Sequence, residues 1–194
     1  MKLYLIIIGI CSLILTAIVS AVYQANFFMT LAYTALGVVA VILVDALVAT
    51  VSRLLPKQCA NHEKRIYKVG AKEKKFYEKL HIRKWKDKIP EIGHFTGFRK
   101  NKIADPKSVE YLDRFLMEAC YGEIGHFFSV FFGFIILLLF PLTETWWAIS
   151  IPVAIINALL NLPSLFVLRY NSYKLEILRK SNLKKQARVK QQEN

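Results

Sequence analysis

One charge-free stretch indicates the class of fold: LYLIIIGICSLILTAIVSAV, residues 3–22. Its length matches the roughly 17–25 apolar residues that a transmembrane helix needs. Three further apolar runs follow at residues 27–51, 127–142 and 146–168, and Asp45 is the only charged residue inside them. We therefore predict an all-α integral membrane protein with four transmembrane helices.

The third run, residues 127–142, is the shortest of the four. As a helix it would span about 24 Å at about 1.5 Å per residue, less than the roughly 30 Å of a bilayer core. It crosses fully only if residues 124–126 join it. The alternative is a re-entrant segment.

The connections predict how the runs are paired. Residues 23–26 and 143–145 are too short to hold a domain, so each pair of runs is expected to form a helical hairpin. The long connection and the tail are polar. We divide the chain into a first hairpin (1–51), a basic cytoplasmic and interfacial region (52–123), a second hairpin (124–168) and a basic tail (169–194).

The positive charge predicts the orientation. The chain has 27 Lys and Arg against 14 Asp and Glu; Lys2 is one, residues 52–123 hold 18, and residues 169–194 hold eight. Positive residues mark the cytoplasmic side, so both termini and the central region are expected there. A cleaved signal peptide is the competing interpretation of residues 3–22, but signal cores run to about 7–15 residues. Because topology explains the charge, no nucleic-acid partner is expected.

The central region has an interfacial composition. Apolar residues recur among lysines, and Trp85 lies between Lys84 and Lys86, as in segments that lie in the membrane interface. Asp105 and Pro106 predict the start of a helix that runs into the third apolar run. The tail is expected to extend the last span as a helix.

Several chemistries lack their sequence signals. The cysteines, Cys11, Cys59 and Cys120, are far apart, which indicates neither a disulfide framework nor a metal site. The chain has no glycine-rich phosphate loop, G-x-S-x-G motif or H-x4-D box. We expect no bound cofactor. His62, His81 and His94 are interpreted as solvated loop residues.

Polar side chains in the spans are functional candidates, because the bilayer makes them costly. They map to the inner half of the membrane and predict a polar cavity that opens to the cytoplasm. The residues are Asp45, Glu123, His126, Ser129, Asn157 and Asn161.

Glu123 and His126 are one helical turn apart and could form a carboxylate–imidazole pair, as a general base requires. Simpler interpretations stay open. Asp45 could be a structural charge paired with a lysine or with His126, the asparagines could bond helices together, and Ser129 could bond its own backbone.

Three ordered motifs resemble the glycosyl-4,4'-diaponeurosporenoate acyltransferase family of bacterial carotenoid biosynthesis. The first is IRKWKDKIPE at residues 82–91, and the second is E-x-x-H-x-x-S at residues 123–129. The third is N-x-P-x5-R-Y-N, with Asn161, Arg169, Tyr170 and Asn171. The resemblance covers roughly residues 79–175.

The resemblance implies a bacterial membrane enzyme that acylates a sugar hydroxyl of a membrane glycolipid at the inner leaflet. The donor would be a cytosolic thioester, either acyl-CoA or acyl carrier protein. His126, oriented by Glu123, would deprotonate the hydroxyl, and Asn161 or Arg169 would stabilise the oxyanion. Supporting substrate contacts are expected from Asp45, Ser129, Asn157, Tyr170 and Asn171. Donor phosphates or the membrane interface would be contacted by Arg83, Lys84, Trp85 and Lys86.

Two alternatives to the acyltransferase remain at this point. One is another small membrane transferase, such as a methyltransferase with a nucleotide cofactor. The other is a non-enzymatic scaffold that binds lipid through its basic region.

Overall fold

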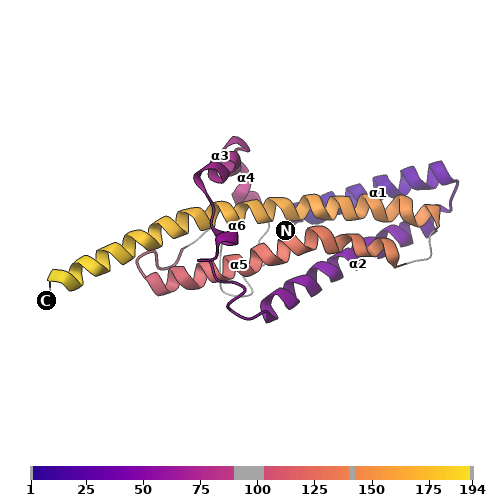
Figure 1. Cartoon of the computed structure of the whole chain (residues 1–194). Coiled ribbons are helices and arrows are strands. Elements are labelled where there is room, and N and C mark those ends of the chain that lie inside the picture. The colour runs from indigo at the N-terminus through magenta and orange to yellow at the C-terminus, as the bar shows by residue number, and fades with distance from the viewer. Residues whose placement is uncertain (1, 90–102, 140–142, 193–194) are drawn as a thin grey trace. The chain divides into compact units, whose positions relative to one another are not determined.

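The computed structural model describes residues 2–89, 103–139 and 143–192, and within these ranges every regular element is helical. The all-α prediction is confirmed. Pro90 and Glu91 of the first motif, His94, and residues 140–142 of the third run lie outside the described residues. Figure 1 shows α1 (Lys2–Tyr23), α2 (Phe27–Leu54), α3 (Ala71–Lys79), α4 (Ile82–Trp85), α5 (Val109–Phe132) and α6 (Glu144–Gln192), and short 3-10 helices cover Arg65–Tyr67, Lys86–Lys88 and Gly133–Leu138.

Four helical stretches are long and apolar enough to cross a membrane: Leu5–Tyr23, Phe27–Leu54, Val109–Leu138 and Glu144–Gln192. The third exceeds the short apolar run because α5 begins in polar sequence and continues as a 3-10 helix to Leu138. The four predicted spans are thereby confirmed as helices of spanning length. The hairpin pairing, the four-part division of the chain and its orientation in the membrane stay predictions.

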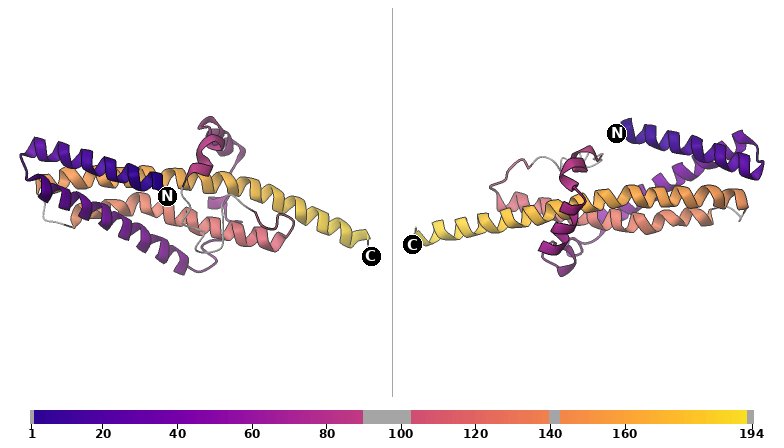
Figure 2. Two further views of the ribbon diagram at one scale, coloured as in Figure 1. Left: turned by 180° about the vertical axis from the view of Figure 1, so that it is seen from behind. Right: turned by 90° about the horizontal axis from the view of Figure 1, so that it is seen from above.

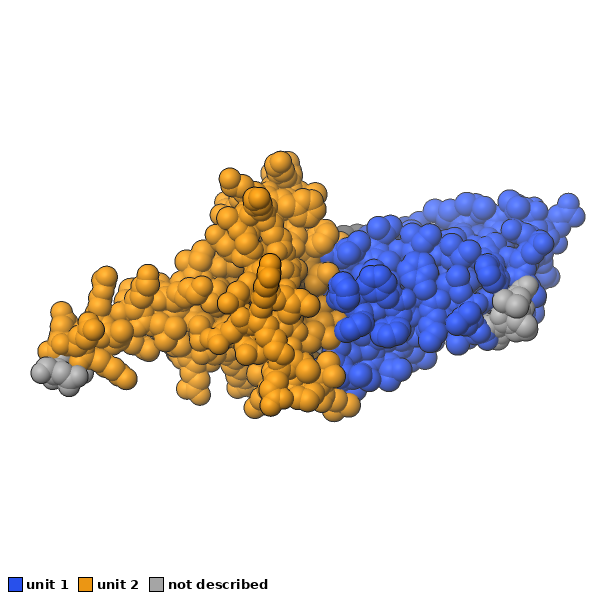
Figure 3. Space-filling view, viewed as in Figure 1, with its two compact units in different colours: residues 1–52, 125–162 blue, residues 53–124, 163–194 orange. Residues whose placement is uncertain are grey.

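The chain forms two compact units, coloured separately in Figure 3. Unit 1 comprises residues 1–52 and 125–162, and unit 2 comprises residues 53–124 and 163–194. Each is described here by itself.

Unit 1 contains α1, most of α2 and parts of α5 and α6. Its buried core includes Val41, Ile136 and Ile149. Polar contacts add to this packing, since Thr16 Oγ1 of α1 donates to Thr34 Oγ1 of α2 at 3.1 Å. A hydrogen bond between buried hydroxyls fixes the facing sides of two apolar helices, whose outer faces remain apolar and exposed as lipid contact requires.

Unit 2 packs the connecting region against the remaining parts of α5 and α6. Tyr77 of α3 and Ile82 of α4 are buried with Val167 and Tyr170 of α6. The chain leaving α2 is held by a hydrogen bond from the Tyr121 hydroxyl to the carbonyl of Leu55, at 3.0 Å. The region between the predicted hairpins is thus a folded layer with a buried core.

The start of α5 differs from the sequence prediction. The helix begins at Val109, and the Ser108 hydroxyl accepts from the Tyr111 backbone N–H at 3.1 Å. Asp105 instead accepts from the N–H groups of Lys107 and Ser108, at 3.1 and 3.2 Å. Asp105 therefore forms a turn before the helix, and Ser108 is the N-cap, because its side chain supplies the capping bond.

The last helix is continuous. α6 runs for 49 residues and passes Pro152 and Pro163, and Figure 2 follows it from two sides. A proline in a helix interior removes a backbone hydrogen bond and costs about 3 kcal/mol, which neighbouring helices can offset in membrane proteins. The prediction that the tail extends the last span as a helix is confirmed.

Candidate functional site

Three polar side chains of unit 1, those of Asp45, Asn157 and Asn161, form a carboxylate–amide cluster. Asn157 Nδ2 donates to Asp45 Oδ1 at 3.2 Å, and Asn161 Nδ2 donates to Asp45 Oδ2 at 3.1 Å. Asn157 Nδ2 also lies 3.5 Å from the backbone carbonyl of Ser129, whose side chain is buried. Asp45 thus receives both asparagines, which lie one helical turn apart on α6.

The cluster ends on a histidine. His126 Nδ1 lies 2.8 Å from Asn161 Oδ1. The amide nitrogen of Asn161 donates to Asp45, so the amide oxygen of Asn161 faces the imidazole. His126 therefore donates from Nδ1–H, and in the neutral ring the lone pair is then on Nε2.

This chain of groups is suited to proton transfer. Asp45 polarises the amide of Asn161, and the amide orients the imidazole of His126 by one defined hydrogen bond. A base needs a fixed tautomer and orientation before its pKa matters. Asn161 is the side chain that contacts His126 Nδ1, whereas the sequence suggested Glu123 as its partner. Whether Glu123 also orients His126 stays a prediction.

A close approach at Gly133 leads to a first prediction. A Cβ atom there would lie 2.7 Å from Asn157 Nδ2, so we expect Gly133→Ala to displace the amide from Asp45. Overpacking of this kind costs about 1–3 kcal/mol, measurable as a lower midpoint of thermal unfolding.

Gly122→Ala is the matched control for this change. Its Cβ would lie 2.8 Å from Leu168 Cδ1, a terminal methyl group that can rotate away. An equal loss of stability in both variants would show that the loss in Gly133→Ala does not come from breaking the hydrogen bond between Asn157 and Asp45.

Unit 2 contains a second polar cluster around Arg169. Its guanidinium forms a two-point ion pair with Glu73 of α3, and donates to Glu123 Oε2 at 2.9 Å and to the Ile66 carbonyl at 3.1 Å. Glu123 is 4% exposed, and its other oxygen lies 3.4 Å from the Ser172 hydroxyl. Four of the five N–H groups of an arginine are thereby used. Arg169 thus joins three segments of unit 2, and a role for it at an oxyanion stays a prediction.

The carboxyl group of Glu73 is perturbed by this cluster. Burial raises its pKa, but hydrogen bonds from Arg169 and from the Tyr77 hydroxyl outweigh burial and hold the pKa below its usual value. A group with a lowered native pKa contributes stability above its unfolded pKa and loses it as the pH falls through the native value.

The perturbed carboxyl predicts a pH dependence. The unfolding midpoint of the wild type should fall as the pH drops below about 4.3, the ordinary value for glutamate. In the Glu73→Gln variant the unfolding midpoint should depend less steeply on pH, because glutamine does not titrate. Identical slopes between pH 6 and pH 3 for both proteins would contradict the assignment.

The remaining predicted site residues also lie in unit 2. Arg83 donates from Nε to the Tyr170 hydroxyl at 2.8 Å and pairs with Glu78. Trp85 Nε1 donates to the Leu80 carbonyl at 2.9 Å. The structure thus joins the first and third motifs through Arg83 and Tyr170. Of the other candidates, Lys84 is exposed, Asn171 is half-buried, and Lys86 pairs with Asp87.

One histidine was misjudged from the sequence. His62 has a side chain only 12% exposed; its Nε2 lies 3.3 Å from Asp113 Oδ1 and its Nδ1 lies 3.4 Å from Glu176 Oε2. The interpretation of His62 as a solvated loop residue is therefore wrong. Its partners are 51 and 114 positions away in the chain, and no local pattern indicated them.

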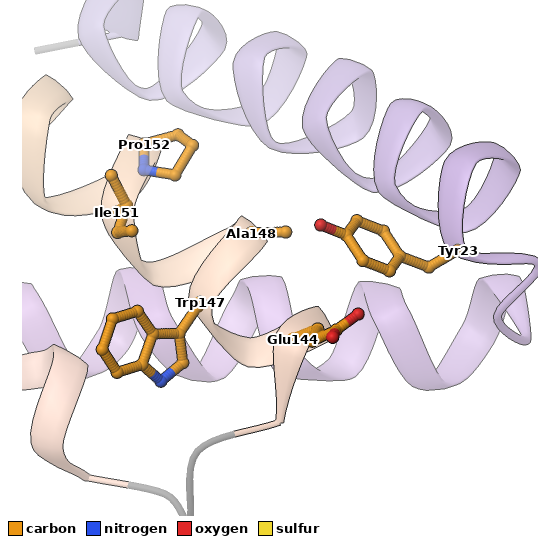
Figure 4. A pocket seen from close by; sticks show the side chains of 6 residues that line it. All are labelled: Tyr23, Glu144, Trp147, Ala148, Ile151 and Pro152. Atoms are coloured by element: carbon orange, nitrogen blue, oxygen red, sulfur yellow. The ribbon is translucent and has the colours of Figure 1, made fainter.

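Each unit has a recess. The recess of unit 1, about 540 Å³, lies where α1 ends and α6 begins, and in Figure 4 the Tyr23 hydroxyl points toward Ala148 beside Glu144 and Trp147. None of the predicted site residues lines it. The recess of unit 2, about 220 Å³, is lined by His62, Cys120 and Ser172 among others.

Comparison with protein families shows which family the chain belongs to. The model of the glycosyl-4,4'-diaponeurosporenoate acyltransferase family matches residues 61–181, more than half of the sequence. The chain belongs to this family. The match contains His126, Asn161 and the whole Arg169 cluster, whereas Asp45 lies outside it. No curated protein and no solved structure gives a significant match.

Membership of the glycosyl-4,4'-diaponeurosporenoate acyltransferase family makes the chain an acyltransferase of carotenoid biosynthesis. The family acts on a glycosylated carotenoid, so the acceptor class is a glycolipid. Four helices of spanning length fit an enzyme whose substrate is dissolved in the membrane. The methyltransferase and scaffold alternatives are not supported.

Proposed function

We propose that the protein moves a fatty acyl group from a cytosolic thioester, acyl-CoA or acyl carrier protein, to a sugar hydroxyl of a membrane glycolipid at the inner leaflet. The observation that supports this most is the hydrogen-bonded chain from Asp45 through Asn161 to His126. It gives the imidazole one tautomer with a basic Nε2. Membership of an acyltransferase family supplies the reaction class.

The reaction balances with His126 as general base. Nε2 accepts the proton of the sugar hydroxyl while its oxygen attacks the thioester carbonyl carbon. The carbon–oxygen bond of the ester forms, the carbon–sulfur bond breaks, and the thiol leaves with the proton from His126. Asn161 and Asp45 are positioning residues, since they act through the imidazole.

The basic segment after α3 is the proposed contact for the donor. Lys84 is exposed, and the neighbouring Arg83 and Trp85 are anchored by hydrogen bonds to Tyr170 and to the Leu80 carbonyl. An anchored segment with an exposed ammonium group suits a phosphate or an acidic carrier protein. The cytoplasmic location of this segment rests on the distribution of Lys and Arg.

Mass spectrometry of total lipids tests this function. Lipids from the native organism with the wild-type gene are compared with those from a deletion strain and from the deletion strain carrying His126→Ala. A glycolipid heavier by one fatty acyl group, present only with the wild type, is the expected result. Identical lipid profiles in all three strains would overturn the proposal.

A further inference from the structure

The exposed surface of α3 combines positive charge with large apolar side chains. Its exposed charged and large apolar residues, with the residue that ends the helix, are Lys72, Lys75, Phe76, Lys79 and Leu80. Phe76 is 49% exposed and Leu80 is 40% exposed. Among the residues that the structure describes, no Asp or Glu side chain lies within ion-pair distance of these three lysines. Exposed cations beside exposed apolar groups are typical of helices that lie in the membrane interface.

The inner side of α3 packs on α6 near the point where the last apolar run ends (Figure 1). Tyr77 is buried with Val167 of α6, and Glu73 forms the ion pair with Arg169. The last apolar run covers residues 146–168. Because an apolar run marks the part of a helix inside the hydrocarbon core, α3 lies at the boundary of the membrane.

The two flanks of α3 meet different parts of α6. The ring of Phe76 lies 6.1 Å from the ring of Phe166, which is inside the apolar run. The ammonium group of Lys74 lies 5.5 Å from the ring of Tyr173, which is beyond the end of that run. The flank with Phe76 therefore faces the bilayer, and the flank with Lys74 faces away from it.

Two lysines and a leucine share the bilayer-facing flank. Lys72 is four positions before Phe76, Lys79 is three positions after it, and Leu80 is four positions after it. Residues at these spacings are neighbours on one side of a helix. Phe76 and Leu80 can reach the acyl chains, while the lysines bury their apolar stems and extend their ammonium groups to the phosphates.

The charge of this flank selects for anionic lipid. Both acidic residues of α3 are held by arginines, Glu73 by Arg169 and Glu78 by Arg83. The bilayer-facing flank thus presents positive charge alone, and each lysine near an anionic membrane surface is attracted to it. An acidic carrier protein would also match the charge, but the orientation of Phe76 toward the apolar run favours lipid.

We infer that the flank of α3 formed by Lys72, Phe76, Lys79 and Leu80 binds anionic phospholipid, with the lysines at the head groups and the apolar side chains at the acyl boundary. This site goes beyond the proposed function, because it needs the membrane but no acyl transfer. It fixes the membrane level of the helix whose other side carries the ion pair with Arg169.

Photocross-linking of the full chain tests the site, in vesicles of equal amounts of phosphatidylcholine and phosphatidylglycerol. Phe76→p-benzoylphenylalanine should cross-link phospholipid. Ala71→p-benzoylphenylalanine should not, because Ala71 is exposed seven positions before Glu78 and so lies on the other flank. Phosphatidylglycerol should exceed its share of the bilayer among the cross-linked lipids by at least about fivefold, the effect of one lysine near an anionic surface.

Charge variants of the chain with p-benzoylphenylalanine at position 76 test the lysines. Lys72→Gln combined with Lys79→Gln should abolish the enrichment of phosphatidylglycerol. Lys107→Gln combined with Lys190→Gln is the matched control, because it removes the same charge from two exposed positions far along the chain from the apolar runs. This pair should keep the enrichment.

Four results would overturn the inference. The first is equal cross-linking of lipid at positions 71 and 76, or none at position 76. The second is cross-linking without enrichment of phosphatidylglycerol, and the third is equal loss of enrichment in both lysine pairs. The fourth is cross-linking of added acyl carrier protein at position 76 in place of lipid, which would make the flank a docking site for a donor protein. Since the assay needs no turnover, its outcome is separate from that of the lipid analysis that tests acyl transfer.

Discussion

Replacing His126 by alanine is expected to lower the rate of acyl transfer by about 10²–10⁴-fold, the range that a positioned general base contributes. The physical reason is the fixed ring: Asn161 accepts from Nδ1–H at 2.8 Å, which leaves the basic lone pair on Nε2. Alanine removes the proton acceptor but no buried charge. The measurement is the initial rate of ester formation by purified protein with a radiolabelled acyl thioester and a glycolipid.

A substitution at Asp45, which contacts His126 through Asn161, should give a smaller loss of rate. In Asp45→Asn, the side-chain amide of Asn161 can rotate so that its oxygen and nitrogen exchange places. This is possible because the new asparagine offers a hydrogen-bond donor as well as an acceptor. His126 then loses its single tautomer but keeps its imidazole. We expect a loss of rate smaller than that of His126→Ala, without a matching change in the KM of the glycolipid.

His81→Asn is the control for loss of a histidine. His81 is exposed and has a positive φ of 53°, which asparagine tolerates. Its rate should equal that of the wild type. If His126→Ala also kept the full rate, at equal yield and equal unfolding midpoint, His126 would have no role in proton transfer.

The spans could be predicted because their signal is local. A bilayer requires a continuous apolar run of fixed length, and residues 3–22 and 27–51 meet this requirement without any tertiary contact. For the same reason Asp45, Asn157 and Asn161 were recognisable as candidates: polar groups at membrane depth are costly and need partners. Their convergence on one carboxylate agrees with that argument.

The contacts of unit 2 could not be predicted, because its composition is that of an ordinary charged surface. Glu73 is one of many charged residues in the lysine-rich region, and its partner Arg169 is 96 positions away. His62 had no neighbour in sequence that indicated burial. Glu123 was a candidate because it enters a span, but periodicity along one helix suggested a partner on that helix. In the structure its carboxylate pairs with the guanidinium of Arg169 on α6.

Arg169→Met is expected to give the largest loss of stability in the chain. The change leaves Glu123, 4% exposed, beside Glu73 without the intervening cation. Removing one partner of a buried ion pair costs about 3–5 kcal/mol, because the remaining charge is desolvated and unpaired. For a chain of this size that corresponds to a drop of at least about 6 °C in the unfolding midpoint, measured in detergent with a thiol-reactive dye.

Two further variants show whether charge or shape is responsible. Arg169→Lys keeps the charge but cannot make the two-point contact with Glu73, so we expect an intermediate loss. Arg169→Met combined with Glu73→Gln and Glu123→Gln removes all three charges and should recover much of the stability.

Arg53→Met is the matched control for this arginine. Arg53 pairs with Glu118 at 2.9 Å, but its side chain is 46% exposed, and solvated pairs contribute about 0–1 kcal/mol. If Arg53→Met and Arg169→Met lowered the midpoint equally, the burial of Glu123 would not be the source of the effect. If the triple variant stayed as unstable as Arg169→Met, the loss would come from packing of the arginine side chain. Arg169 belongs to the R-Y-N end of the third motif. Recovery by the triple variant would mean that this end of the motif preserves the fold of unit 2, whereas its first residue, Asn161, contacts His126 in unit 1.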